Sequence, residues 1–290
     1  MPDPATTIAI LGSGAVGALI GAELTRAGVA MTLVTTERSA EAIARDGVTV
    51  TSPRFGDHTI AVDAQTHLGI APDVLVVAVK APHLQAAIAR IAGNPGVVVP
   101  LLNGVDHVAA LRARFARVVA GTVRVQAHRE GPTHVVHRAP FLTVTIAQPG
   151  VPALAGALQA AGIGTVRGGL EADVLWGKLS RLAALALATT AADAPLGEVR
   201  ETAEAVAREV ATVAVAEGAA IDADTIVAEL RVLPDTASSS LRADVTANRA
   251  DHELDAIGGA VLRAARRHDL LAPRTSELVA RVQRRAAGSL

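Results

Sequence analysis

Cysteine is absent from the 290-residue chain, and aromatic residues are almost absent. Without cysteine the chain forms no disulfide, no thiolate metal site and no cysteine nucleophile. One Trp, three Phe and no Tyr leave no aromatic platforms on which nucleic-acid bases could stack. The formal net charge is −1, and the small group Arg263, Arg266 and Arg267 has the helical spacing of a solvated face. We therefore expect no nucleic-acid partner.

Long apolar runs are also lacking. No uncharged apolar stretch approaches the roughly 18 residues of a membrane-spanning helix, so we expect no membrane partner. The first residues, MPDPATT, lack the basic start of a signal peptide, which favours a cytoplasmic protein. His128, His134 and His137 are the one cluster that suggests a metal, but no further ligand pattern accompanies them, and we expect no metal site.

Half of the residues are hydrophobic, enough to bury a sizeable core, and the first half of the chain alternates strand-like and helix-like segments. Predicted strands cover residues 6–12, 29–35, 73–80 and 96–104, and predicted helices cover residues 15–28, 38–47, 82–92 and 106–115. A hairpin-like excursion surrounds residues 54–57. The continuous apolar run DVLVVAVK is typical of a parallel strand covered on both faces. This order predicts a doubly wound α/β domain.

The second half changes character. Residues 118–147 read as strands without helices between them, which suggests a meander that extends the sheet. From about residue 172 to the end the pattern is helical, with breaks at residues 195–197, 217–218, 233–235 and 272–273. We therefore predict an N-terminal Rossmann-type domain over residues 1–168 and an all-helical substrate or dimerisation domain over residues 169–290.

A glycine loop follows the first predicted strand and opens the first helix. In Gly12-Ser13-Gly14-Ala15-Val16-Gly17, the first glycine permits a tight turn, the second lets a pyrophosphate approach the backbone, and the third allows close helix packing. The free N–H groups and positive end of the helix suit phosphates. The pattern predicts a bound dinucleotide, with FAD as a competitor to a nicotinamide cofactor.

The end of the second predicted strand bears on the choice between NAD and NADP. An acid there binds the ribose 2′-hydroxyl of NAD, whereas neutral residues with a nearby arginine suit the 2′-phosphate of NADP. Thr36 and Arg38 favour NADP, and Glu37 favours NAD. Arg38 fits equally well as the exposed first turn of the next helix. We expect NADP(H).

Five further motifs follow in order along nearly the whole chain. They are VAVKAPHL with Lys80, LLNGVDH with Asn103, VLWGKL with Lys178, SSSLRAD with Ser240 and HELDAIGGAV with Glu253. Together with the glycine loop, their order and spacing resemble the ketopantoate reductase (2-dehydropantoate 2-reductase) family. The resemblance implies a Rossmann domain, a helical domain and an active site in the cleft between them. It also implies reduction of a 2-oxo acid by NADPH, giving pantoate on the route to coenzyme A.

The resemblance also implies roles for these residues. Lys178 corresponds to the catalytic acid, Asn103 lies near the nicotinamide and the reacting carbonyl, and Glu253 holds the lysine ammonium or binds substrate. Ser240 corresponds to a substrate-binding residue, although residues 238–240 also suit a helix cap. Lys80 lines the cleft on the cofactor side.

The chain departs from the family on the helix after Lys178. Where the family carries asparagines four and eight residues further on, this chain has Leu182 and Ala186. We expect a more apolar pocket, with Arg181 as a carboxylate anchor, and another branched 2-oxo acid or ketone as an alternative substrate. A weakly catalytic dinucleotide-binding regulator is a further alternative, and a homodimer is plausible.

Overall fold

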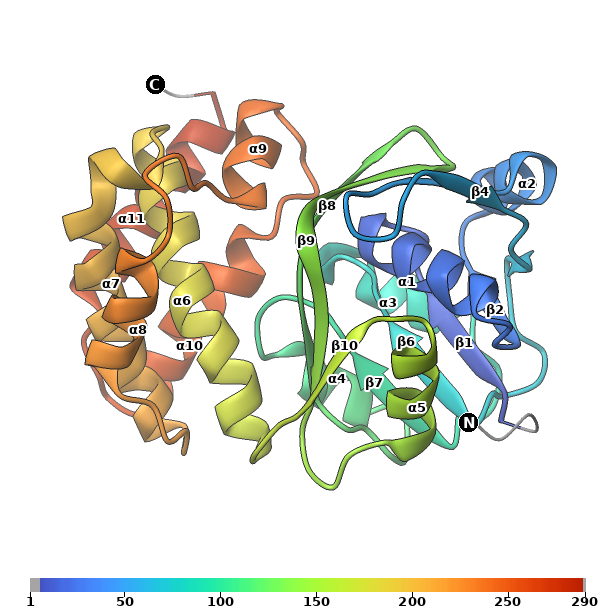
Figure 1. Cartoon of the computed structure of the whole chain (residues 1–290). Helices are drawn as coiled ribbons and strands as arrows, with labels where there is room; N and C mark the ends of the chain where they lie inside the picture. Colours follow the sequence, from blue (N-terminus) through green and yellow to red (C-terminus); the bar gives the residue numbers. More distant parts are fainter. Residues whose placement is uncertain (1–5, 289–290) are drawn as a thin grey trace. The chain divides into compact units, whose positions relative to one another are not determined.

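The computed structural model describes residues 6–288, which fall into two compact units (Figure 1). The first unit contains residues up to 102 together with residues 107–171, and the second contains residues 103–106 and the chain from residue 172 onward. The short segment 103–106 therefore belongs with the helical part of the chain, although the last strand of the parallel sheet ends only three residues before it, at Pro100.

A five-stranded parallel sheet forms the centre of the first unit. Its strands lie in the order β5 (Ala64–Gln65), β2 (Met31–Val34), β1 (Ile8–Leu11), β6 (Val74–Val77) and β7 (Val97–Pro100). Every residue of β1, β6 and β7 is buried, as continuous apolar strands covered on both faces should be. The connecting segments are α1 (Ala15–Arg26), α2 (Glu37–Asp46), the short η1 (Ala81–His83) with α3 (Leu84–Ile88), and α4 (His107–Arg112). The predicted doubly wound domain is confirmed.

The predicted meander does not extend this sheet, and that expectation is wrong. The strands β8 (Gly121–Glu130) and β9 (His134–Ile146) form a long hairpin within a second sheet. In that sheet β10 (Gly164–Arg167), β9, β3 (Val48–Thr51) and β4 (His58–Ile60) lie side by side in this order, and α5 (Pro152–Ala160) precedes β10. The hairpin joins the second sheet because β3 offers β9 a free edge, with Val50 opposite Val135.

Helix α1 contacts strands of both sheets, which explains its composition. Residues Gly17 to Leu24 are all buried, so the helix has no solvent-facing stripe over these two turns. A helix that is apolar around most of its circumference, here interrupted only by Glu23, is expected where other elements cover it all round. The glycine loop therefore leads into a helix that is buried in the core of the first unit.

The second unit is helical throughout. Its elements are α6 (Glu171–Ala192), α7 (Leu196–Ala216), α8 (Ala223–Arg231), α9 (Ser240–Thr246), the π-helical segment η2 (Asp255–Gly259), α10 (Ala260–Arg267) and α11 (Pro273–Ala286). The predicted breaks at residues 217–218 and 233–235 lie between helices, those at 195–197 and 272–273 coincide with the starts of α7 and α11, and a fifth interruption lies between α9 and η2. Between residues 6 and 288, no helix is both long enough and apolar enough to cross a membrane.

Candidate active site

The glycine loop has the geometry that a dinucleotide phosphate requires. Gly12 has φ of +110°, and a side chain there would meet Val79 and the Ala78 carbonyl. A Cβ on Gly17 would overlap the carbonyl oxygen of Gly12, so this position closes the helix onto the loop. A Cβ on Gly14 would find nothing nearer than the Ala78 oxygen at 3.9 Å, which leaves space for a ligand. The loop therefore fits a pyrophosphate at the N-terminus of α1.

The polar residues after β2 serve partly as local structure. Thr36 is the N-cap of α2, and its hydroxyl accepts a hydrogen bond from the backbone N–H of Ser39 at 3.4 Å. Arg38 is exposed in the first turn of the helix and forms no ion pair with any residue that the structure describes. Thr36 thus fixes the start of the helix, while Arg38 is available to an anionic ligand.

Lys80 lies three residues after the end of β6, the strand that pairs with β1. It follows β6 and is the N-terminal flanking residue of η1, and its side chain is partly buried. Two residues earlier, Ala78 presents its carbonyl to Gly12 and Gly14. Lys80 therefore stands at the carboxyl edge of the parallel sheet, where open α/β folds bind ligands.

Lys178 lies in the second unit, on the second turn of α6, and is partly buried. Burial lowers the pKa of its ammonium from 10.5 to about 8, with a smaller lowering by the Arg181 guanidinium. The Glu253 carboxylate acts in the opposite direction and raises this pKa. A cation whose pKa lies near physiological pH can both hold and release a proton, as a general acid must.

Asn103 and Glu253 meet although they are 150 positions apart. The Asn103 side-chain amide Nδ2 donates to Glu253 Oε2 at 2.8 Å, and both side chains are partly buried. The π-helical η2 begins two residues after Glu253, and such segments are frequent at functional sites. Together with the electrostatic effect on Lys178, this contact brings the three predicted catalytic residues into one part of the second unit.

Arg263 anchors the segment that carries Asn103, and its role was missed in the sequence. Its Nε and Nη2 donate to Asp106 Oδ2 at 3.0 and 2.7 Å, and its Nη1 donates to Asp255 Oδ1 at 2.7 Å. Gly104, with φ of +85°, has no room for a side chain because the Ala256 carbonyl lies against it. Arg263 keeps part of its side chain in solvent, as expected of a solvated face, and it also joins residues 103–106 to η2.

The predicted substrate-binding residues and the Ala186 position differ in exposure and in hydrogen-bond partners. Ser240 is exposed at the start of α9, and the neighbouring Ser239 is the cap, accepting from the Arg242 N–H at 3.1 Å. Arg181 donates through Nη1 to Glu229 Oε2 at 2.8 Å and keeps its remaining donors. Ala186 is fully buried in the helical core.

Leu182 is partly buried and packs against the same helical core. Of the two positions where the family has asparagines, it is therefore the more accessible one. An apolar side chain at this position is consistent with a less polar wall near Lys178.

The three histidines lie in ordinary structural contacts. His137 bonds Ser52 Oγ through Nδ1 at 2.9 Å and the Phe141 carbonyl through Nε2 at 3.0 Å. His134 bonds Thr51, and His128 lies 3.0 Å from a carboxylate oxygen of Glu130. Within residues 6–288, no three His, Asp or Glu side chains gather in an arrangement that could hold a metal ion.

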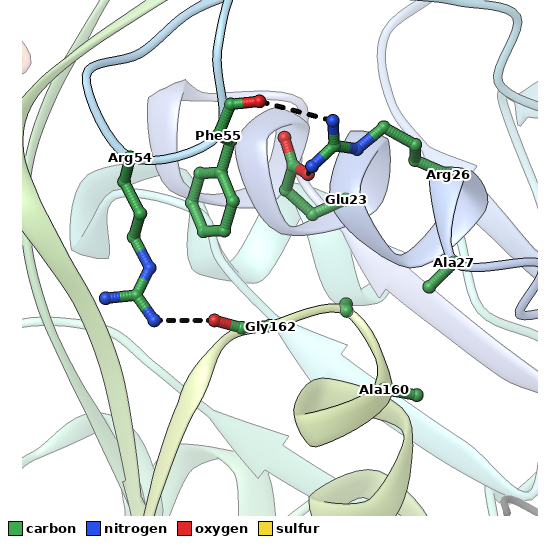
Figure 2. A pocket seen from close by; sticks show the side chains of 8 residues that line it. Glu23, Arg26, Ala27, Arg54, Phe55, Ala160 and Gly162 are labelled. Atoms are coloured by element: carbon green, nitrogen blue, oxygen red, sulfur yellow. Dashed lines mark hydrogen bonds and ion pairs between the residues drawn. The ribbon is translucent and has the colours of Figure 1, made fainter.

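A hollow of about 690 Å³ opens on the first unit beside the C-terminal half of α1 (Figure 2). Its most unusual residue is Glu23, whose side chain is completely buried next to Arg26 and His58 at 3.0 and 3.2 Å. Burial raises the pKa of Glu23, and the two neighbouring basic groups offset part of this rise. Figure 2 shows Arg54 and Arg26 donating to the carbonyls of Gly162 and Phe55 across the rim, so these arginines are already engaged.

Comparison with known proteins identifies the family. The model of "Ketopantoate reductase PanE/ApbA" matches residues 8–149, and that of "Ketopantoate reductase PanE/ApbA C terminal" matches residues 172–286. The chain belongs to the ketopantoate reductase family. A 2-dehydropantoate 2-reductase of Mycobacterium tuberculosis is 30% identical over 288 residues, covering 95% of this chain and 96% of that protein. The chain is accordingly an oxidoreductase that acts on CH–OH groups and binds a dinucleotide.

Solved structures show the same fold. A PanE/ApbA family ketopantoate reductase from Ralstonia eutropha JMP134 superposes with a TM-score of 0.86 at 25% identity, covering 98% of this chain and 99% of that one. A D-mandelate dehydrogenase solved with NADH and anilino(oxo)acetate also reaches a TM-score of 0.86, at 19% identity and with the same coverage. The Rossmann-type and helical domains predicted from the sequence are thus confirmed as a fold.

Proposed function

We propose that this reductase converts 2-dehydropantoate (ketopantoate) to pantoate with NADPH, on the route to coenzyme A. The observation that carries the proposal is the grouping of Lys178, Glu253 and Asn103 in the second unit, with the pKa of Lys178 at about 8. The curated relatives that share about 30% of the sequence are named 2-dehydropantoate 2-reductases.

The chain's own residues supply the proton and the orientation. NADPH, when bound, supplies the hydride that reaches the carbonyl carbon. The Lys178 ammonium donates a proton to the carbonyl oxygen as negative charge develops there, and the neutral amine regains a proton from solvent. Glu253 keeps the ammonium charged, since its carboxylate raises the pKa of Lys178. Asn103 is held by Glu253 and orients the reacting carbonyl.

The remaining predicted residues bind the two ligands. Gly12, Gly14 and Gly17 shape the pyrophosphate loop, with Ser13, Ala15 and Val16 presenting its backbone, while Thr36, Arg38 and Lys80 complete the cofactor side. In the second unit, Arg181 anchors the substrate carboxylate with donors not used by Glu229, and Ser240 binds the substrate. NADP is favoured over NAD by Arg38, which has no acidic partner in the described part of the chain.

A different 2-oxo acid is a second candidate substrate. Leu182 and Ala186 stand where the family has asparagines, and because Ala186 is buried in the helical core, only Leu182 is placed to remove an amide group from the pocket wall. Each lost hydrogen bond to a buried substrate hydroxyl weakens discrimination by ~1–3 kcal/mol. The D-mandelate dehydrogenase with the same fold was solved with NADH and anilino(oxo)acetate, so the fold also accommodates a 2-oxo acid analogue with an aromatic substituent.

One kinetic panel tests these alternatives together. NADPH and NADH oxidation are measured with ketopantoate, other branched 2-oxo acids and aryl 2-oxo acids, using wild type and Lys178→Ala. The proposal expects the highest kcat/KM for NADPH with ketopantoate, and loss of turnover by orders of magnitude in the variant with NADPH binding retained. Preference for another acid supports the second candidate. Absence of turnover with every acid, together with tight NADPH binding, favours a regulator.

A further inference from the structure

An arginine from the second sheet reaches the glycine loop. Arg129 lies near the end of β8, 116 positions after Ser13, and its Nη1 donates to the Ser13 carbonyl oxygen at 2.6 Å and to Ser13 Oγ at 3.3 Å. The Ser13 hydroxyl in turn bonds the hydroxyl of Thr35, the residue that follows β2. The guanidinium therefore lies over the loop where the first and second strands of the Rossmann fold end.

The guanidinium has no anion to balance its charge. Within residues 6–288, Arg129 has no carboxylate partner, and its Nε and Nη2 have no acceptor. Burial of the group lowers its pKa, so its environment disfavours the cation. Arg129 is exposed as a residue, so water solvates part of its charge, and a bound anion would supply the counter-charge and the acceptors that its Nε and Nη2 lack.

The start of α1, next to Arg129, also favours a bound anion. The first turn of α1 carries no acidic residue, and its first hydrogen bond runs from the Ala18 N–H to the Gly14 carbonyl. The N–H groups of Ala15 and Val16 are therefore left without partners inside the helix and add positive potential at the same loop. A planar guanidinium with free donors matches phosphate oxygens in pairs.

We propose that Arg129 is a phosphate-binding residue of the dinucleotide site, holding Ser13 with one edge of its guanidinium and a cofactor phosphate with the other. The inference rests on the proposed dinucleotide-dependent function. It adds a residue outside the glycine motif, on an element of the second sheet. The guanidinium could bind either the pyrophosphate or the 2′-phosphate of the adenosine ribose. Comparing NADPH with NADH distinguishes the two, because only NADPH carries the 2′-phosphate.

Calorimetric titration of NADPH and NADH, without substrate, tests the proposal. Arg129→Gln keeps a donor for the Ser13 carbonyl but removes the charge, and Arg129→Lys keeps the charge. We expect Arg129→Gln to raise Kd for NADPH by about 10- to 100-fold and to flatten its dependence on salt concentration, with Arg129→Lys retaining much of the affinity. Arg124→Gln, exposed on the same strand with its guanidinium over the Phe141 ring, is the matched control and should leave Kd unchanged.

The results distinguish the two candidate phosphates, and they distinguish a wrong assignment of Arg129 from a wrong proposed function. Equal weakening of NADPH and NADH assigns Arg129 to the pyrophosphate, and weakening of NADPH alone assigns it to the 2′-phosphate. An unchanged Kd in Arg129→Gln, or a loss with an unchanged salt dependence, overturns the proposal and leaves Arg129 as a brace for Ser13. Failure of wild type to bind either nucleotide would instead overturn the proposed function, and melting curves without ligand verify that each variant is folded.

Discussion

Replacing Lys178 by methionine should make the protein more stable while removing its turnover. The pKa of Lys178 falls from 10.5 to about 8 on folding, which corresponds to about 3 kcal/mol of destabilisation while the group is charged. Methionine has similar length and no charge, so it keeps the packing and avoids this cost. At pH 7 we therefore expect Lys178→Met to raise the free energy of unfolding by up to about 3 kcal/mol.

The stability difference between Lys178→Met and wild type should decrease as the pH rises. Because the folded-state pKa of Lys178 is below the unfolded one, the unfolded chain binds more protons between about pH 8 and 10.5, and wild-type stability rises relative to the variant across that window. The advantage of Lys178→Met should therefore be full below pH 8 and vanish by pH 10.5. Urea unfolding can be followed by the fluorescence of Trp176, which is the chain's only tryptophan and is 3% exposed.

Two results would refute the reasoning. One is a variant that is less stable than wild type at pH 7, and the other is a stability difference that does not change between pH 7 and 10. The chain has only two lysines, Lys80 and Lys178, so NMR of ¹³C-methylated lysines can also measure the pKa directly. Single Lys→Arg variants assign the two signals.

Three other predictions follow from the same structure. Gly14→Ala should leave the melting temperature unchanged but weaken NADPH binding at least about tenfold. Gly17→Ala should lower the melting temperature, because only its Cβ overlaps a backbone atom, the Gly12 carbonyl oxygen. Equal losses of melting temperature in the two variants would contradict this. Glu253→Gln should lower the pKa of Lys178 and so move the alkaline limb of the kcat/KM profile to lower pH, and an upward shift would show that another group titrates. Because burial raises the pKa of Glu23, wild-type stability should fall relative to Glu23→Gln as the pH rises from 4.5 through the folded-state value; melting temperatures between pH 4 and 8 that run parallel would refute it.

Local patterns made part of the fold predictable. The glycine loop, the buried parallel strands and the breaks between helices each depend on residues close together in the chain, and the structure has them where they were expected. The second sheet was not predicted, because β9 pairs with β3 across 85 positions, as in Thr49 opposite His134. Alternating polarity shows that a strand has a buried face, but not which edge it joins.

The candidate site was less predictable from local patterns. Lys178, Asn103 and Glu253 were found only through the order of family motifs, because the Asn103–Glu253 contact and the desolvation of Lys178 arise in three dimensions. Arg129 and Arg263 carry no motif at all. In the sequence, neither can be told from an ordinary surface arginine. Only the contact of Arg129 with Ser13 and that of Arg263 with Asp106 distinguish them.

Substrate binding should be coupled to proton uptake at Lys178. At pH 8 about half of the Lys178 side chains are protonated, because the pKa is about 8. A 2-oxo acid carboxylate bound nearby would favour the ammonium, as the Glu253 carboxylate already does, and would raise this pKa. Calorimetric binding of ketopantoate to the NADP⁺-loaded enzyme at pH 8, in buffers of different ionisation enthalpy, should therefore show uptake of up to about half a proton per chain. The uptake should disappear in Lys178→Met, and binding heats that are independent of the buffer would mean that the carboxylate binds away from Lys178.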